Sequence, residues 1–536
     1  MQGSFYSIII PEKLNMTDLV FSSRKDKSRT AILFEDKRIS FNELEEIVNR
    51  IGNFLKGEGV GIGDKVLIRM PNHPLYIAIN MAIIKIGAVS VPTSTLFRHQ
   101  ELEHIINDCN AKFAISTPEL LGELEKVKAK NLKEVFTVLG EKGNYKSLDR
   151  EYVKHSSFLN SHLTSKDDIA FILYTSGTTG FPKGIPHAHR WLIALGEPNV
   201  EAVMAIRPSD RIFTPIEMTW MWPWGYNFWF PLYRGASTCI YTGRFEPERT
   251  FEYIEKYKAT HVVGNPTIYR RLLRVENFER KYDLSSLRAS FSSGETVSPE
   301  LYSEWKKRAG VDLFDCMGQT ELHVFTATRP GYIKPGSMGK PLPGIPVGVV
   351  KEDGEPCNVN EIGFLAIDKS FLGLTPGYLN REDEWKSKIL KNWYLTGDYA
   401  YYDEDGFLWY VSRTDDLIKS RGYLISPMEI EAVLQQHKAV FEVAVIGVSD
   451  PELREKIVAI IMLKEGFNPS EILAKNIKEF IISRIAPFKA PKEIIFVRNL
   501  PRTVTGKLMR KTLKELIQRD YEEFKRRFEE IARYSV

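Results

Sequence analysis

The sequence predicts an α/β protein that has a large N-terminal domain of layered β-sheets flanked by helices and a smaller α+β C-terminal domain. The chain has 536 residues, more than one hydrophobic core normally supports. Short apolar runs alternate with amphipathic helical patterns up to about residue 410, an order typical of parallel sheets. Near Asp415 charged residues interrupt the apolar pattern, so we expect domains over 1–414 and 415–536.

The N-terminal elements follow from local signals. Ser40 and Glu43 form an S-x-x-E capping box, which predicts a helix that ends near Gly57 and Gly59. A short strand over 66–68, a helix over 75–85 and a strand over 89–91 then make a βαβ unit, hence a parallel sheet. Similar alternation predicts strands over 114–116, 211–214, 261–263 and 289–292.

The C-terminal part carries its own set of elements. A strand over 407–411 precedes the charged stretch, and a helix is predicted with Ser426 as N-cap, Pro427 in its first turn and Glu429 three residues after the cap. Strands over 443–446 and 457–462 follow. These elements suffice for a small α+β domain.

Composition excludes several classes of protein. The net charge of +4 is small and no long basic block appears, which argues against nucleic-acid binding. The apolar stretch 76–91 is broken by Asn80 and Lys85, and no signal peptide precedes it, so we expect no membrane span. The cysteines are far apart, which argues against a zinc site or a disulfide framework and favours the cytoplasm: Cys109, Cys239, Cys316 and Cys357.

A glycine-rich stretch follows the apolar run 169–173 and reads YTSGTTGFPKG over 174–184. Backbone N–H groups, hydroxyls and Lys183 in such a loop can hold phosphate. An ordinary surface turn is the alternative, since Gly, Ser, Thr and Pro are common turn residues. The loop is not a Walker A motif, because Pro182 and Gly184 stand where that motif needs Gly and Ser or Thr.

Five further motifs lie in the chain: SSGET over 292–296, MGQTE over 317–321, YLTGD over 394–398, SRTDDLIKSRGY over 412–423 and PRTVTGKLMR over 501–510. With the glycine-rich loop, their order and spacing resemble the adenylate-forming superfamily of acyl-CoA synthetases, amino-acid adenylation domains and luciferases. PGSMGKPLPG and GYLNRED, over 335–344 and 377–383, look most like its medium-chain acyl-CoA and benzoate-CoA ligase branch. The resemblance implies that the C-terminal domain is mobile.

The resemblance also implies a two-step reaction. A carboxylate attacks the α-phosphate of ATP, with Mg²⁺ offsetting the repulsion between anions, and releases pyrophosphate. The thiol of coenzyme A then displaces AMP from the acyl-adenylate. An acceptor other than CoA, or a noncatalytic nucleotide-binding protein on the same fold, are the alternatives. The absence of a following carrier-protein domain favours a stand-alone ligase, and Lys507 and Glu321 argue against a noncatalytic protein.

The resemblance assigns the family's nucleotide-binding and metal-binding roles to the matching positions of this sequence. The loop would wrap the β and γ phosphates, Glu321 would hold Mg²⁺ beside Thr320, and Asp398 would take the ribose hydroxyls with help from Arg413. Asp315 would accept a hydrogen bond from the adenine amino group. Gly294, Glu295 and Thr296 would form one wall of the adenine pocket. The phosphate loop comprises Thr175, Ser176, Gly177, Thr178, Thr179, Gly180 and Lys183, and the other nucleotide-binding residues of this part are Asp315, Cys316, Met317, Gly318 and Gln319.

The C-terminal motifs imply separate parts for the two steps. Lys507 would lie between the substrate carboxylate and the α-phosphate and stabilise the first transition state, so that Lys507, Thr175 and Glu321 form the catalytic set. A lysine on a basic surface is the alternative for Lys507. Asp415 would be the hinge about which the small domain rotates. The loop from Lys419 would then approach pantetheine, with Gly422 leaving room for it.

The acid pocket is assigned to an aromatic segment. Residues 218–232 carry four of the nine tryptophans, and the resemblance places Trp220, Met221, Trp222 and Trp224 beside the acyl channel. A core helix is the alternative. Gly318 stands where acetate-activating relatives carry a tryptophan, which predicts an open pocket floor. Medium-chain, branched, hydroxylated short-chain and aryl acids remain open, as does self-association into a homo-oligomer.

Overall fold

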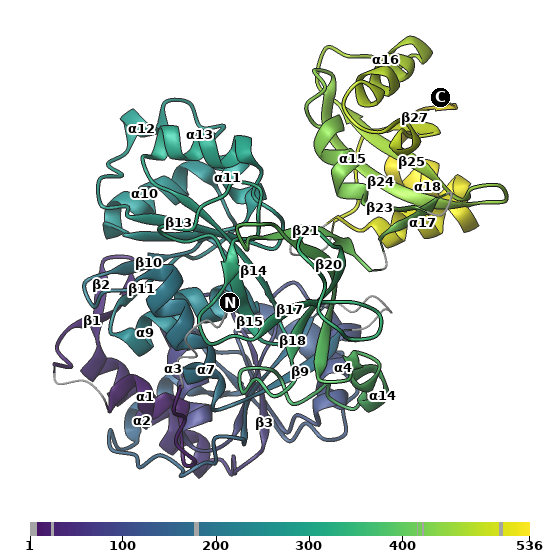
Figure 1. The fold of residues 1–536 in the computed structure, drawn as a ribbon. Coiled ribbons are helices and arrows are strands. Elements are labelled where there is room, and N and C mark those ends of the chain that lie inside the picture. Colours follow the sequence, from purple (N-terminus) through teal and green to yellow (C-terminus); the bar gives the residue numbers. More distant parts are fainter. Residues whose placement is uncertain are drawn as a thin grey trace. The chain divides into compact units, whose positions relative to one another are not determined.

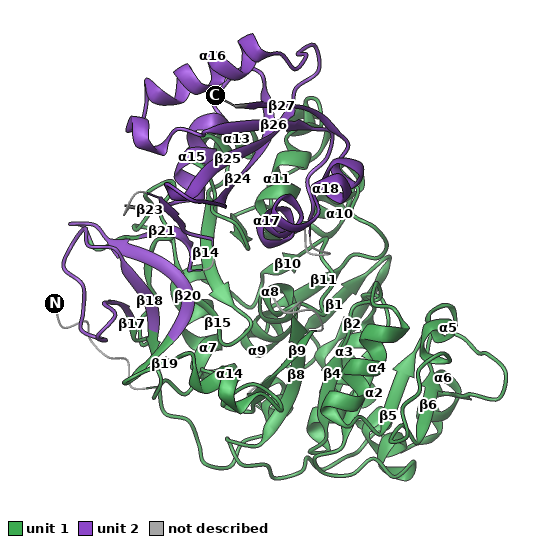
Figure 2. Cartoon of the chain, turned by 90° about the vertical axis from the view of Figure 1, so that its right-hand side faces the viewer, with its two compact units in different colours: residues 1–347, 367–394, 406–408 green, residues 348–366, 395–405, 409–536 purple. Residues whose placement is uncertain are grey.

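The computed structural model describes residues 8–22, 26–175, 182–414, 416–420, 423–502 and 508–535. Packing divides the chain into two compact units, shown in Figure 2. Unit 1 comprises 1–347, 367–394 and 406–408, and unit 2 comprises 348–366, 395–405 and 409–536. Because these units interleave along the chain, the division at 414/415 stays a prediction.

A seven-stranded sheet contains the predicted βαβ unit (Figure 1). Strand β3 pairs with β4 and with β5 in parallel, as the sequence predicts, whereas β8 and β9 form an antiparallel hairpin. Leu67 and Val91 of this sheet pack against Leu102 and Ile105 of helix α4. In spatial order the strands are β7 (Lys146–Ser147), β6 (Glu134–Thr137), β5 (Phe113–Ser116), β3 (Lys65–Arg69), β4 (Val89–Pro92), β8 (Ile169–Thr175) and β9 (Lys183–Ala188).

A nine-stranded sheet holds most of the remaining strands of unit 1. Its centre is parallel, and the antiparallel strands β14 and β15 make a hairpin with a bulge after Met317. Tyr269 and Trp305, from helices α11 and α13, pack on Val262 of this sheet. In order the strands are β16 (Lys340–Pro341), β15 (His323–Ala327), β14 (Leu313–Gln319), β13 (Ala289–Ser293), β12 (His261–Gly264), β10 (Arg211–Phe213), β11 (Ser237–Ile240), β1 (Thr30–Phe34) and β2 (Lys37–Ser40).

The helix predicted after Ser40 begins where its capping box indicates. Ser40 accepts a hydrogen bond from the Glu43 backbone while Glu43 accepts one from the Ser40 backbone, which confirms the capping box. The α-helices are α1 (Met16–Phe21), α2 (Phe41–Gly57), α3 (Pro74–Lys85), α4 (His99–Cys109), α5 (Leu121–Leu124), α6 (Leu148–Glu151), α7 (Trp191–Pro198), α8 (Met221–Pro223), α9 (Phe230–Arg234), α10 (Pro247–Tyr257), α11 (Pro266–Leu272), α12 (Phe278–Lys281), α13 (Pro299–Ala309) and α14 (Glu382–Lys386).

Short helices of other kinds join some of these elements. They comprise the 3₁₀-helices η1 (Pro118–Leu120), η2 (Tyr152–Lys154) and η5 (Pro487–Lys489), and the π-helices η3 (Asn199–Met204) and η4 (Trp224–Trp229). The π-helix η4 continues α8 within the aromatic segment. Single π-helical turns are rare and occur often at functional sites.

A four-stranded sheet with helices on both faces gives the C-terminal part its predicted α+β character. Ile430 of α15 and Ile477 of α16 pack in one core, and Leu513 of α17 and Phe524 of α18 pack in another. The strands are β24 (Val440–Asp450), β25 (Arg454–Leu463), β26 (Glu493–Val497) and β27 (Glu530–Ser535), and the helices are α15 (Pro427–Leu434), α16 (Glu471–Ile482), α17 (Arg510–Arg519) and α18 (Tyr521–Phe528).

Two small sheets complete the fold. A five-stranded sheet contains β17 (Val347–Val350), β18 (Gly363–Asp368), β20 (Trp393–Tyr402), β19 (Ile389–Leu390) and β21 (Leu408–Arg413), and a ribbon pairs β22 (Ile418–Ser420) with β23 (Tyr423–Ile425). Within the described ranges, no helix is both long enough and apolar enough to span a bilayer.

One local prediction differs from the structure. Helix α15 begins after Ser426, but the Ser426 hydroxyl makes no cap hydrogen bond and instead donates to the Val411 carbonyl. Glu429 forms an ion pair with Lys489 rather than a capping box. The cap residues therefore mark the start of the helix, but their side chains contact Val411 and Lys489, which are distant in sequence within unit 2.

Candidate active site

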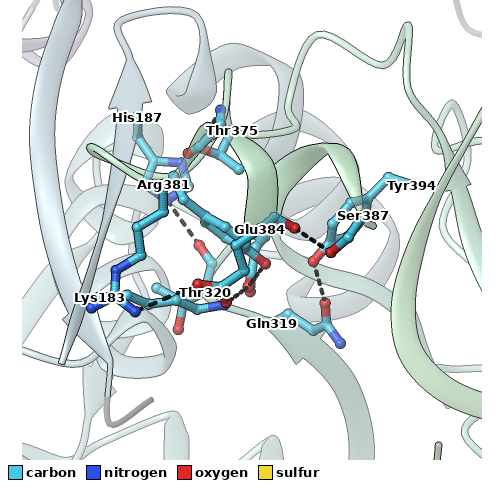
Figure 3. Close-up of polar contacts among 12 residues, drawn as sticks. Lys183, His187, Gln319, Thr320, Thr375, Arg381, Glu384, Ser387 and Tyr394 are labelled. Carbon is cyan, nitrogen blue, oxygen red and sulfur yellow. Dashed lines mark hydrogen bonds and ion pairs between the residues drawn. The ribbon is translucent and has the colours of Figure 1, made fainter. Parts of the chain in front are cut away.

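Strands β8 and β9 place Lys183 at the base of the glycine-rich loop. Thr175 ends β8 directly opposite Lys183, the first residue of β9. The Lys183 Nζ lies 3.1 Å from Glu384 Oε1 and 3.8 Å from Glu321 Oε1, and its side chain is 14% exposed. Figure 3 shows Lys183, Glu384 and Arg381 gathered at this point. The site thus has a shielded cation beside two carboxylates.

The hairpin of β14 and β15 presents Glu321, which directly follows Thr320, to this cation. Three contacts hold the turn: His187 Nε2 lies 2.8 Å from the Thr320 carbonyl, Trp191 Nε1 donates to the Leu322 carbonyl, and the Thr375 N–H donates to the Glu321 carbonyl. Burial lowers the pKa of His187 to about 3, so its ring is neutral near pH 7. Because a carbonyl only accepts, the neutral ring carries its proton on Nε2.

Tyr378 connects the lysine with the glutamate, a role that the sequence motifs did not identify. Its hydroxyl donates to Glu321 Oε1 at 2.8 Å, and its ring centroid lies 3.6 Å from Lys183 Nζ. The next residue, Leu379, donates its N–H to the Gly184 carbonyl, which fixes this segment beside β9. Burial raises the pKa of Tyr378, so the phenol keeps its proton and acts as a donor. Its only sequence signal was the GYLNRED stretch.

Glu384 of α14 is the second residue that the motifs missed. Burial by itself would raise the pKa of Glu384, but the hydrogen bond from Lys183 and the charge of Arg381 outweigh it, so the pKa is lowered. Arg381 Nη1 lies 3.5 Å from Glu384 Oε2. The carboxylate of Glu384 therefore stays ionised and, together with that of Glu321, offsets the charge of Lys183.

Glu321 suits the metal role that the resemblance implies. In the described part of the chain, no group of three or more His, Cys, Asp or Glu side chains could hold a metal ion. Mg²⁺ keeps several waters and is usually bound by one or two carboxylates together with substrate phosphates. One shielded carboxylate beside Lys183, the lysine that the resemblance assigns to phosphate, fits that pattern, and a bound Mg²⁺ would supply positive charge to the phosphates.

The adenine segment is tied to β14 through Asp315. This carboxylate is buried, and its Oδ2 accepts a hydrogen bond from the Val297 N–H at 2.8 Å. The predicted residues Gly294, Glu295 and Thr296 directly precede Val297, so the contact positions them. Burial raises the pKa of Asp315 to about 7. Whether this carboxylate also meets adenine stays a prediction.

Residues 316–319 continue β14 from this point. Cys316 is buried, with its Sγ 3.9 Å from Tyr226 Oη, whereas Met317, Gly318 and Gln319 keep some exposure. A Cβ added to Gly318 would lie 2.6 Å from the His323 carbonyl oxygen. Close approach of the two strands therefore requires glycine here, independently of any pocket floor.

Unit 2 contains the residues predicted for ribose and pantetheine. Asp398 is buried and its Oδ1 accepts a hydrogen bond from Arg413 Nη1 at 3.0 Å. Arg413 thus pairs with Asp398 within this unit. Lys419 has an exposed side chain, and its backbone N–H donates to Glu455.

The aromatic segment divides into core residues and half-exposed residues. Trp224 is buried against Tyr76 and Phe171, as the core alternative predicts, and Met221 is also buried. Trp220 and Trp222 keep part of their surface, and Trp222 Nε1 donates to the Gly264 carbonyl. The contact of these residues with an acid stays a prediction.

Several predicted residues lie outside the described ranges. They are Ser176, Gly177, Thr178, Thr179 and Gly180 of the loop, the hinge Asp415, Gly422 and Lys507.

Comparisons with known proteins agree with the motifs. The model of the AMP-binding enzyme family matches residues 21–379, and that of the AMP-binding enzyme C-terminal domain matches residues 429–507. YtcI of Bacillus subtilis (strain 168), described as an uncharacterized acyl-CoA ligase, is 34% identical over 516 residues, covering 95% of this chain and 97% of that protein. A benzoate-CoA ligase of Thauera aromatica is 31% identical over 511 residues, covering 94% of this chain and 96% of that protein.

A solved structure matches over the same length. The anthranilate CoA ligase AuaEII, in complex with anthranoyl-AMP, has a TM-score of 0.88 and 32% identity, and the match covers 94% of this chain and 98% of that chain. The predictions of fold class, family and enzyme class are thereby confirmed. The chain belongs to the AMP-binding enzyme family of adenylate-forming ligases, which use ATP, Mg²⁺ and CoA.

Proposed function

We propose that the protein is an acid-CoA ligase whose substrate is a medium-chain, hydroxylated short-chain or aryl carboxylic acid. The observation that carries the proposal is the cluster of Lys183, Glu321 and Tyr378 at the base of the glycine-rich loop. It combines a shielded cation with a carboxylate held in one orientation. Such a pair can bind the phosphates of ATP and one Mg²⁺ ion.

The chain's residues would divide the work as follows. Lys183 and the loop 175–180 hold the β and γ phosphates, and Glu321 takes the Mg²⁺ that offsets their charge. Asp398 receives the ribose hydroxyls. Lys507 meets the carboxylate of the acid at the α-phosphate during the first step, and the loop that contains Gly422 admits the CoA thiol in the second.

Two finer proposals concern the domains and the location of the protein. The two family models leave residues 380–428 unmatched, which supports a domain boundary at 414/415 within that stretch. We place the protein in the cytoplasm. The four cysteines, Cys109, Cys239, Cys316 and Cys357, are all free, which supports a reducing compartment.

The test is to incubate the protein with ATP, Mg²⁺, CoA and a panel of straight-chain, hydroxylated and aryl acids, and to quantify AMP and acyl-CoA. We expect both products in equal amounts for at least one acid. Glu321→Gln is the matched control, because it keeps the size of the side chain and removes its charge. AMP without acyl-CoA would indicate a different acceptor, and nucleotide binding without AMP would indicate a noncatalytic protein.

A further inference from the structure

Helix α4 carries two polar side chains that no motif contains, His104 and Asp108. They are four positions apart, so both lie on one face of the helix. Leu102 and Ile105 of the same helix are buried in the core of the seven-stranded sheet, and α4 lies beside β9 (Figure 1). The helix is therefore anchored to the sheet and can support the segments that contact its polar face.

One contact of this face reaches β9 where that strand begins. His104 Nε2 lies 2.8 Å from the carbonyl oxygen of Pro182, the residue that directly precedes Lys183. Because a carbonyl only accepts, His104 carries a proton on Nε2 and donates it in this bond. The imidazole is partly buried, which shields the bond from water. The peptide that leads into Lys183 is thus held by α4.

A second contact reaches the neighbouring strand β8 through Tyr174. The Tyr174 hydroxyl donates to Asp108 Oδ2 at 2.7 Å. Tyr174 pairs with Gly184 across the hairpin, and a Cβ added to Gly184 would lie 2.9 Å from the phenol ring. Glycine at 184 therefore lets this ring lie against β9 beside Lys183. Burial raises the pKa of Tyr174, so the phenol keeps its proton for the bond to Asp108.

A third contact reaches the segment that carries Tyr378. Asn380 Nδ2 donates to the Asp108 carbonyl at 2.7 Å and to Asp108 Oδ1 at 3.2 Å. Asn380 has a backbone φ of 53°, a left-handed conformation that asparagine adopts more readily than most residues. Asp108 thus uses one carboxylate oxygen for β8, and its other carboxylate oxygen and its carbonyl for this segment.

The three contacts converge on the residues proposed to bind phosphate. Pro182 directly precedes Lys183, and Asn380 follows Tyr378 by two positions. Lys183 Nζ lies 3.6 Å from the ring centroid of Tyr378, whose hydroxyl donates to Glu321. A shift of one of these backbones relative to the other would change both contacts. One face of α4 is tied to both backbones.

We propose that His104 and Asp108 are positioning residues, which act through Lys183 and Tyr378 to shape the site for the β and γ phosphates of ATP. The inference rests on the proposed ligase function, in which Lys183 binds these phosphates. Neither His104 nor Asp108 needs to contact the nucleotide itself. AMP has no β or γ phosphate. Both residues should therefore affect the binding of ATP and not that of AMP.

The experiment measures the Kd of ATP and of AMP by calorimetry in the presence of Mg²⁺. We expect His104→Phe, which keeps a ring and removes the donor, to weaken ATP binding about fivefold, and Asp108→Ala about tenfold, with AMP binding unchanged. His104→Gln and Asp108→Asn should restore part of the affinity, because each keeps a hydrogen-bonding group. Asn107→Ala is the matched control: this exposed residue lies on the same helix, so both Kd values should stay at those of the wild type.

A double substitution tests whether His104 acts through Lys183. Lys183→Ala should itself weaken the binding of ATP more than that of AMP. Adding His104→Phe to Lys183→Ala should cause little further loss, because residues that act as one unit are not additive. A merely structural role of His104 would give the same loss in both backgrounds. Thermal midpoints check that every variant is folded, and if Asp108→Ala unfolds, the His104 variants carry the test.

The outcomes distinguish this inference from the function on which it rests. If the wild-type protein does not bind ATP, or if Lys183→Ala binds it as well as the wild type, the ligase proposal loses the observation that carries it. If Lys183→Ala weakens ATP binding but the His104 and Asp108 variants do not, the ligase proposal stands and the positioning role is wrong. Equal losses on ATP and AMP in folded variants would also overturn it, since α4 would then support the whole nucleotide site.

Discussion

At the scale of single residues, the site is built around a lysine whose charge is already balanced. Lys183 lies between Glu384 and Glu321 and above the ring of Tyr378. If Lys183 binds phosphate as proposed, a nucleotide phosphate competes with Glu384 for the same cation. This competition predicts that Glu384 weakens nucleotide binding.

Glu384→Gln should tighten ATP binding by about threefold, because it removes the competing charge from a partly exposed ion pair. The measurement is the Kd of ATP by calorimetry at two salt concentrations, and the difference should shrink at high salt. Glu382→Gln is the matched control on the same helix, since Glu382 forms an ion pair with Lys386. Weaker ATP binding by Glu384→Gln would instead assign Glu384 a supporting role.

Asp315 predicts a pH dependence of stability. Its pKa rises from 3.8 to about 7 on burial, so between these values the folded state holds a proton that the unfolded state has lost. The contribution of Asp315 to stability therefore falls as pH rises from about 4 to 7. Asp315→Asn keeps an acceptor for the Val297 N–H and does not ionise. Its thermal midpoint relative to wild type should increase steadily over this pH range.

That comparison is made without nucleotide, with both proteins in the same buffers. Lowered pKa values of buried histidines such as His187 change stability in the opposite direction over a similar range, but they cancel in the difference between the two proteins. A difference that stays constant with pH would show that Asp315 is ionised throughout.

At the scale of elements, the hairpin of β14 and β15 organises the site. Its bulge and its tight approach at Gly318 bring Thr320, Glu321 and His323 into one turn. Bulges commonly redirect side chains next to active sites. The hairpin should therefore tolerate little change in the distance between the backbones of β14 and β15 at Gly318.

Gly318→Ala tests this spacing. The added Cβ would lie 2.6 Å from the His323 carbonyl oxygen, so the strands must separate, and we expect a loss of about 1–3 kcal/mol of unfolding free energy. Gly122→Ala in α5 is the matched control, because a Cβ there meets no atom within 4 Å. Chemical denaturation of both variants measures the difference. Equal stability would mean that the hairpin is looser than the structure shows.

At the scale of the whole molecule, a single substitution should impair one of the two reaction steps and leave the other intact. Lys507→Ala should reduce adenylate formation on the order of a hundredfold or more, because a positioned cation stabilises the developing charge. It should leave thioester formation from a supplied acyl-adenylate intact. Gly422→Leu should do the reverse by filling the path of pantetheine. Single-turnover assays of each step provide the measurement, and equal loss in both steps for either variant would contradict its assigned role.

The sequence by itself determined the elements and the family. The capping box at Ser40 and Glu43 and the βαβ unit over 66–91 depend on contacts within a few turns of the chain, so local patterns predict them. The motifs from the glycine-rich loop to Lys507 identified the adenylate-forming family for the same reason, since each is a short stretch that carries its own chemistry.

Only the tertiary structure decided which side chains meet. Glu384 is 201 positions from Lys183 and Tyr378 is 57 positions from Glu321, and no local pattern encodes either pair. His323 reads in the sequence as one more residue of an apolar strand, and the four aromatic rings that enclose it are brought together only in the folded structure. Such contacts depend on the register and packing of strands far apart in the chain, where small shifts exchange one partner for another.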